Sequence, residues 1–99
     1  MIRVLDEALA ELLVATKWYD LQRDGLGDEL LEAINDALTL IQESPNAWPV
    51  MPGSRGARRY VCKGFPYAVF YTIHSESIWV VAIAHTSRHP GYWLHRLNH

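Results

Sequence analysis

Ninety-nine residues make about one domain, and a chain of this length can bury a core without the disulfides or structural metal on which much shorter chains depend. The composition is 49% hydrophobic and 20% charged, which excludes an intrinsically disordered chain. The single cysteine, Cys62, excludes an internal disulfide and is typical of a reducing cytoplasm. The longest apolar runs, 67–73 and 78–84, are far shorter than the roughly 20 residues of a membrane span, and the sequence opens without a signal-peptide pattern. We therefore expect one cytoplasmic domain over residues 1–99, with no membrane association.

The net charge of −2 hides an uneven distribution along the chain. Residues 1–53 carry three basic and ten acidic side chains, a net charge of −7. Residues 54–99 carry six basic side chains, one acidic side chain and all five histidines, a net charge of +5 with the histidines neutral. This asymmetry indicates either a positive face that meets a polyanion or an acidic partner, or acidic residues that simply decorate solvated helices.

The first predicted element is a brief edge strand, because residues 2–4 are short, alternating and β-branched. From Asp6 the apolar spacing changes to three and four residues, which predicts a helix with one buried stripe. We expect this helix to run to about Asp24 and to end at Gly25, since glycine readily adopts the left-handed conformation of a helix C-cap. The expected buried stripe is Leu5, Leu9, Leu12, Leu13, Thr16 and Tyr19.

A second helix is predicted almost immediately after the first. Asp28 and Glu29 suit a helix N-terminus, and the apolar spacing continues until Ser44 and Pro45. Two helices of similar length joined by so few residues must form an antiparallel hairpin. The stripe expected to face the core is Leu30, Leu31, Ile34, Ala37, Leu38 and Ile41.

Three strands are predicted after an irregular loop, residues 46–57, that is interrupted by prolines and glycines. They cover residues 58–63, 67–74 and 78–85, and the short turns between them predict an antiparallel meander. The third strand is apolar throughout and should be central. We therefore predict an α+β fold with the element order β-α-α-β-β-β, in which a helical hairpin packs on a small antiparallel sheet.

Basic residues are expected at both ends of this meander, because consecutive strands run in opposite directions. One end is expected to hold Lys63, His85, Arg88 and Tyr92. The other end is expected to hold Arg55 and Arg58 or Arg59. A cationic site with a tyrosine and histidines could bind phosphate and stabilise a transition state, or its arginines could pair with the acidic helices.

The histidines and the cysteine do not predict a metal site or a thiol nucleophile. Zinc sites normally add cysteine or carboxylate ligands in a held geometry, and the histidine-rich C-terminal segment has neither. A Cys62–His85 pair would need an orienting group, so Cys62 is interpreted as a small packed residue. We expect no metal and no cofactor. The histidines considered are His85, His89, His95 and His99.

Short motifs then follow one another along the chain, each weak by itself. They are residues 15–19, 25–31, 41–45, 58–60, 65–71, 82–85 and 88–93. In order and spacing they resemble the RelE/ParE superfamily of toxins from type II toxin–antitoxin systems, over nearly the full length of the chain. The superfamily has the β-α-α-β-β-β fold predicted above. The resemblance implies a small bacterial toxin that inhibits growth and is neutralised by a cognate antitoxin whose flexible segment wraps it.

The superfamily has two mechanisms, and the first is cleavage of mRNA on the ribosome. In this branch basic residues and a C-terminal tyrosine promote attack of the ribose 2′-hydroxyl on the adjacent phosphate, without a metal. The resemblance places Arg88 and Tyr92 at these C-terminal positions and Arg58 or Arg59 as the strand arginine. Tyr92 could transfer a proton only if its pKa were lowered by neighbouring cations, so His85 would be the easier base.

The second mechanism is inhibition of DNA gyrase by a branch that generally lacks this catalytic set, and we favour it. The loop over residues 46–57 has Arg55 as its single basic residue, where ribosomal nucleases carry several. Thr86 and Ser87 stand where further bases would support cleavage, and a net charge of −2 suits a binder of ribosomal RNA poorly. A third possibility is a non-toxic module that only holds an antitoxin.

Partner contacts are expected from aromatic and basic side chains. Tyr19 and Trp79 lie on stripes that predict packing, whereas the tryptophans of the loop and the tail either cover a core edge or anchor a partner. A domain of this size cannot hide all of its aromatic surface, so we expect the antitoxin to cover Trp18, Trp48 and Trp93. The residues expected to contact partners are Trp18, Tyr19, Arg58, Lys63, Trp93 and Arg96.

Overall fold

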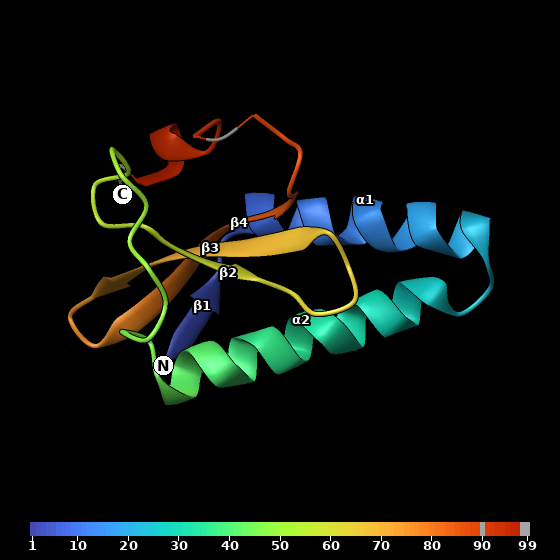
Figure 1. The fold of residues 1–99 in the computed structure, drawn as a ribbon, viewed down its shortest axis with the longest axis horizontal. Helices are drawn as coiled ribbons and strands as arrows, with labels where there is room; N and C mark the ends of the chain where they lie inside the picture. The colour runs from blue at the N-terminus through green and yellow to red at the C-terminus, as the bar shows by residue number, and fades with distance from the viewer. Residues whose placement is uncertain (90, 98–99) are drawn as a thin grey trace.

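A computed structural model of the protein describes residues 1–89 and 91–97. Its helices and strands follow in the predicted order, and a short 3-10 turn comes after them (Figure 1). The elements are β1 (Ile2–Val4), α1 (Asp6–Gln22), α2 (Leu26–Glu43), β2 (Arg58–Val61), β3 (Tyr67–His74), β4 (Ser77–His85) and η1 (Leu94–Leu97). His99, one of the histidines considered as a metal ligand, lies outside the described residues.

The four strands form one sheet in the order β1-β4-β3-β2. β2, β3 and β4 pair antiparallel, so the predicted meander and the inner position of β4 are confirmed. β1 pairs with residues 78–80 of β4 in parallel, which corrects the wholly antiparallel sheet to a mixed one. The chain between β1 and β4 includes the whole helical hairpin, and this supplies the long connection that parallel neighbours require.

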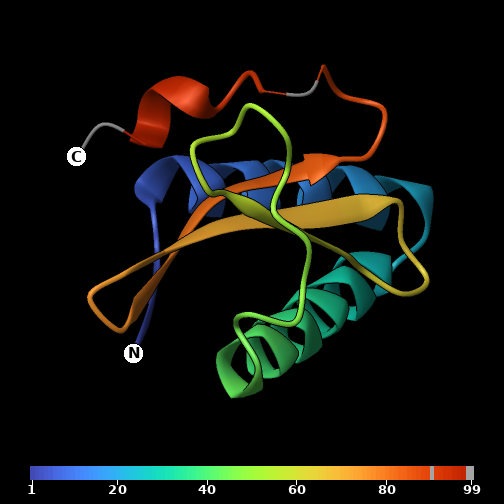
Figure 2. The ribbon, with the colours of Figure 1, turned by 60° about the vertical axis from the view of Figure 1, so that its left-hand side comes forward.

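The helical hairpin packs on one face of the sheet (Figures 1 and 2). Its turn contains Gly25, whose φ of 86° is the predicted left-handed conformation. Gly25 is the N-cap of α2, however, and α1 ends earlier than predicted, at Gln22. A Cβ atom on Gly27 would lie 2.5 Å from the carbonyl oxygen of Thr16, so glycine lets the two helices approach closely here. Within the described chain, neither helix is both long enough and apolar enough to cross a bilayer.

The two helices match the sequence expectations to different degrees. The predicted stripe of α2 is confirmed, since its buried members lie in the main core and Leu31 and Leu38 pack against it. In α1 the expected stripe is partly wrong: Leu9 and Leu13 are 45% and 50% exposed. Apolar residues surround almost the whole of α1, so periodicity could not choose its inner face. The residues that α1 buries are Ala8, Leu12, Ala15 and Thr16.

The other face of the sheet is covered by the loop before β2 and by the C-terminal segment. Figure 2 shows these two segments side by side above the sheet. Arg55 Nη2 donates a hydrogen bond to the carbonyl oxygen of Leu94 at 3.0 Å, and this bond joins them. Trp93 is 1% exposed and packs on Phe70 with 4.9 Å between ring centroids. The C-terminal segment therefore completes a second, smaller core.

Candidate functional site

The last residues of β4 have an edge that no described strand covers. β1 pairs with residues 78–80 only, which leaves residues 81–85 open on that side. Two side chains take the place of a neighbouring strand. The Glu11 carboxylate accepts a hydrogen bond from the Ile83 N–H at 3.1 Å, and Arg96 Nη1 donates to the Val81 carbonyl oxygen at 3.0 Å. Exposed strand edges are templates for pairing with another chain, and here side chains protect the edge.

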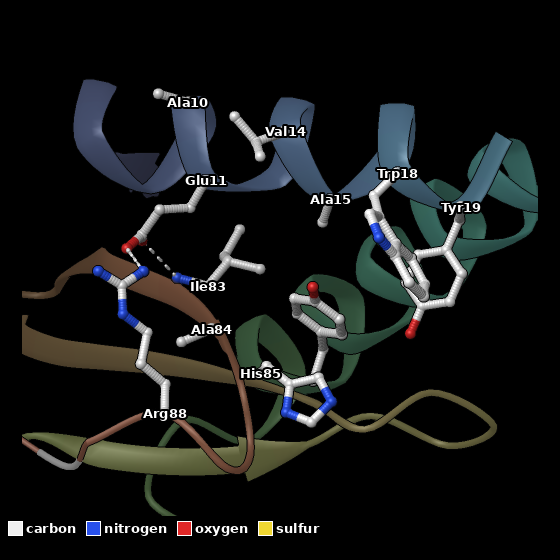
Figure 3. A pocket seen from close by; sticks show the side chains of 11 residues that line it. Ala10, Glu11, Val14, Ala15, Trp18, Tyr19, Ile83, Ala84, His85 and Arg88 are labelled. Atoms are coloured by element: carbon white, nitrogen blue, oxygen red, sulfur yellow. Dashed lines mark hydrogen bonds and ion pairs between the residues drawn. The ribbon is translucent and has the colours of Figure 1, made fainter. Parts of the chain in front are cut away.

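Between α1 and this edge lies a groove of about 580 Å³ (Figure 3). Its walls are mainly apolar, and the α1 wall includes Val14 and Trp18, which are 70% and 54% exposed. Glu11 and Arg88 lie toward one end of the groove, and Tyr19 lies toward the other. The groove is therefore open and apolar, with the ion pair of Glu11 and Arg88 at one end.

Glu11 connects α1, β4 and the C-terminal segment. Besides the Ile83 N–H, its carboxylate accepts hydrogen bonds from the Tyr92 hydroxyl and from the Arg96 guanidinium, at 3.0 Å and 3.3 Å for the latter. Arg88 Nη1 lies 3.6 Å from the same carboxylate. Both Glu11 and Arg96 are largely buried, so their charges compensate each other. Sequence reasoning missed Glu11, because nothing in the sequence separates it from the nine other acids of residues 1–53.

Tyr92 lacks the lowered pKa that proton transfer would require. Burial, the hydrogen bond to Glu11 and the charge of Glu11 raise the pKa of Tyr92 to about 12. Arg88 and Arg96 act in the opposite direction but with smaller effect. The sequence-based condition for Tyr92 as a proton-transfer group is therefore not met, because the phenol holds its proton while it donates to Glu11.

His85 is fixed in one tautomer by its neighbour. The backbone N–H of Ser87 donates to His85 Nδ1 at 3.0 Å, and Ser87 Oγ lies 2.7 Å from the same nitrogen. A backbone N–H can only donate, so Nδ1 is the acceptor and the proton of the neutral ring is on Nε2. His85 thus presents an N–H donor at Nε2, where a general base would present a lone pair.

A second cavity, of about 280 Å³, brings together the residues weighed as catalytic. This arginine pocket lies on the sheet face opposite the helices and reaches the end of β4. The expectation that Arg59 and Arg88 lie at opposite ends of the sheet is wrong. β2 has only four residues and pairs with residues 68–71 of β3, the half nearest His85, so even its start is close to that end. The lining of the arginine pocket includes Arg59, Phe70, His85, Arg88, His89 and Tyr92.

Three of the predicted contact residues make contacts within the fold of this chain. Arg58 donates to the carbonyl oxygens of Trp48 and Asn46, at 2.6 Å and 3.2 Å, and so holds the loop before β2. Trp93 is buried in the second core, and Arg96 is committed to Glu11. These three side chains stabilise the protein.

The remaining contact candidates are divided between two sides of the molecule. Lys63 was expected beside His85 and Arg88, but it lines a different cavity with Asp36 and Glu43 of α2. Trp48 is half-buried and packs edge-on against Tyr60, with 4.7 Å between ring centroids. Only the two α1 aromatics, Trp18 and Tyr19, line the open groove.

Cys62 and the histidines do not assemble a reactive site in the described part of the chain. Burial raises the pKa of the Cys62 thiol to about 11, which disfavours a thiolate. Residues 1–89 and 91–97 contain no group of three or more His, Cys, Asp or Glu side chains placed to hold a metal ion.

Comparison with known proteins gives a consistent picture. A sequence family described as the ParE toxin of type II toxin–antitoxin system, parDE, matches residues 2–90. Among solved structures, the chain is similar to one described as the chromosomal ParDE TA system from P. aeruginosa, with a TM-score of 0.65 at 16% sequence identity. That alignment covers 85% of this chain and 92% of the other, so the two share a fold. No curated protein matches the sequence.

Proposed function

The chain belongs to the ParE family of toxins of type II toxin–antitoxin systems, and we propose from this that it inhibits DNA gyrase in the cytoplasm and is neutralised by a cognate antitoxin. A member of the ribosomal branch would instead cleave mRNA. The two activities require different chemistry, so the arginine pocket is the place where they can be distinguished.

The observation that supports gyrase inhibition is that both candidates for proton transfer are already engaged. The Tyr92 hydroxyl donates to Glu11 and has its pKa raised to about 12. His85 uses Nδ1 to accept from Ser87 and carries a proton on Nε2. Cleavage of RNA by its own 2′-hydroxyl needs a group that can accept that proton within hydrogen-bond reach. Arginines alone bind a phosphate but do not supply this step.

The groove beside α1 supports the antitoxin part of the proposal. An extended antitoxin segment could pair with the edge of β4, replacing the side chains that now bond to Val81 and Ile83. Its apolar side chains would cover Val14 and Trp18, and an acidic residue would meet Arg88 at the end of the groove. Main-chain pairing gives affinity in such complexes, and the pockets along the strand give specificity.

One observation favours the ribosomal alternative, namely that Arg59, Arg88 and Tyr92 line the same pocket. In that case a bound mRNA would have to separate Tyr92 from Glu11 before the phenol could act. Tyr92→Phe tests this directly. The variant should remain as toxic as the parent protein if gyrase is the target, and it should lose toxicity if Tyr92 takes part in cleavage.

The decisive experiment compares the two targets after induction of the chain alone in bacteria. We expect growth arrest, loss of supercoiling by purified gyrase in the presence of the protein, and recovery of supercoiling when the product of the neighbouring gene is added. Primer extension on induced cells should find mRNA intact. Codon-phased cuts within minutes of induction would identify the ribosome as the target. Normal growth at full expression would identify the chain as a non-toxic module that binds an antitoxin.

A further inference from the structure

Arg59 is a partly buried arginine in the lining of the arginine pocket. Among the described residues its guanidinium makes no hydrogen bond or ion pair, and its Nε atom is buried and unsatisfied. The adjacent Arg58 differs completely, since its guanidinium bonds to two carbonyl oxygens of the preceding loop. Buried donors are nearly always satisfied in native proteins, so an unsatisfied guanidinium in a cavity points to a ligand that supplies the acceptor.

The cavity around Arg59 is lined by a second arginine and two histidines, and its own described lining contains no carboxylate. Arg88, His85 and His89 share its lining, and no Asp or Glu is present among the described residues that line it. The guanidinium carbon of Arg88 lies over the Tyr92 ring, 3.8 Å from its centroid, and this cation–π contact helps to position the guanidinium. His85 adds a donor at Nε2 because Ser87 occupies Nδ1. Glu11 lies outside this lining, 3.6 Å from Arg88, and compensates the charge of Arg88, whereas Arg59 has no carboxylate partner among the described residues. An anion in the cavity would supply that missing partner.

The size and chemistry of the cavity define the anion. At about 280 Å³ it is too small for a folded peptide segment but accommodates a compact group with several acceptor oxygens. Guanidinium groups donate in a planar fork that matches phosphate oxygens and forms charge-assisted hydrogen bonds. The ring of Phe70 gives the cavity an aromatic wall beside the cations.

We propose that the arginine pocket is a phosphate-binding site, centred on Arg59 and Arg88, that holds a phosphate of a nucleic-acid backbone or of a free nucleotide without cleaving it. This goes beyond gyrase inhibition and does not depend on it. The absence of cleavage follows from geometry, because the Tyr92 hydroxyl is bound to Glu11 and His85 Nδ1 is bound to Ser87. His85 and Arg88 also line the α1 groove, whereas Arg59 lines the arginine pocket and not the groove, so variants of Arg59 test the pocket separately.

The test is a titration of the full-length protein followed by NMR of the arginine Nε–H and backbone amide signals. The probes are inorganic phosphate, adenosine monophosphate and a short single-stranded RNA. We expect saturable shifts at Arg59 and Arg88, and Arg59→Gln should weaken binding roughly 10-fold or more because it removes charge-assisted hydrogen bonds. The matched control is Arg23→Gln, which removes one positive charge at an exposed position of the helical hairpin and should leave binding unchanged.

The probes also identify the source of the phosphate. Tighter binding of the RNA than of inorganic phosphate assigns the site to a nucleic-acid backbone, and preference for the mononucleotide assigns it to a free nucleotide. The proposal is overturned if no probe shifts the Arg59 signals, or if Arg59→Gln and Arg23→Gln weaken binding equally. Shortening of the RNA during the titration would overturn the non-cleaving assignment.

A measurement of stability separates a ligand site from a structural role. Arg59→Gln removes an unpaired cation from a cationic cavity, so the melting temperature should stay the same or rise. Arg58→Gln removes donors from two carbonyl groups and should lower it. A clear loss of stability in Arg59→Gln would identify a structural residue and contradict the proposal.

Discussion

The two helices of the hairpin have nearly equal lengths, 17 and 18 residues, but they use their surfaces differently. α2 buries Leu30, Ile34 and Ile41 on one side and is largely acidic or polar on the other. α1 buries mainly small residues and leaves Val14 and Trp18 exposed along the groove. A helix that is apolar on nearly all sides is normally covered on all sides. The difference fits the proposed function, in which the sheet covers the inner side of α1 and the antitoxin covers the outer side.

The largest expected effect tests the inner surface of the hairpin. Leu30→Ala in α2 removes a fully buried side chain and should reduce the free energy of unfolding by about 2–5 kcal/mol. Leu13→Ala on the half-exposed side of α1 should change it by no more than about 0.5 kcal/mol. Urea denaturation of both variants measures the contrast. Similar losses in the two variants would mean that the exposed side of α1 contributes to the core of the isolated protein.

The next effect tests the outer surface of α1. Trp18→Ala should weaken antitoxin binding by about 2 kcal/mol, a factor of about 30, because large aromatic side chains are frequent hot spots of interfaces. It should leave the stability of the free protein almost unchanged, since the side chain is 54% exposed. Leu40→Ala is the matched control, an exposed apolar residue on α2. Calorimetry with the product of the neighbouring gene should find control and parent equal. If the Trp18→Ala variant bound the antitoxin with unchanged affinity, the exposed side of α1 would not be part of the antitoxin interface.

The smallest expected effect tests the hydrogen bond from Tyr92 to Glu11, which connects the C-terminal segment to α1. Among the described residues α2 has no such connection. The pKa of Tyr92 is raised from 10 to about 12, so the folded protein holds the phenolic proton more tightly than the unfolded chain. The resulting stabilisation is complete below about pH 10 and is lost as the pH rises through about 12.

Denaturation curves between pH 9 and 12 should therefore show a steeper loss of stability for the parent than for Tyr92→Phe. The comparison with the variant is needed because burial also raises the pKa of Tyr67 and of Tyr71. Equal slopes for the two proteins would show that the phenol and Glu11 are not linked in solution.

Much of the fold could be predicted from the sequence, because the information is local. The stripe of α2, the left-handed Gly25 and the three strands of the meander all follow from spacing and turn residues within short windows. The inner face of α1 could not be predicted, since leucines lie on both sides of that helix. The parallel pairing of β1 could not be predicted either, because the sequence of residues 2–4 is the same whichever direction the neighbouring strand runs.

For the candidate site, residue types together with the resemblance to the superfamily selected His85, Arg88, Tyr92 and either Arg58 or Arg59. Their roles were decided only by tertiary structure. Glu11 is distant from Tyr92 and Arg96 in the chain, yet its carboxylate orders both and also protects the edge of β4. Arg58 and Arg59 are neighbours in sequence, but alternation along β2 directs one to a loop and the other into a cavity. The physical reason is that hydrogen bonds and charge compensation depend on which groups meet in space, whereas periodicity records only which residues face a core.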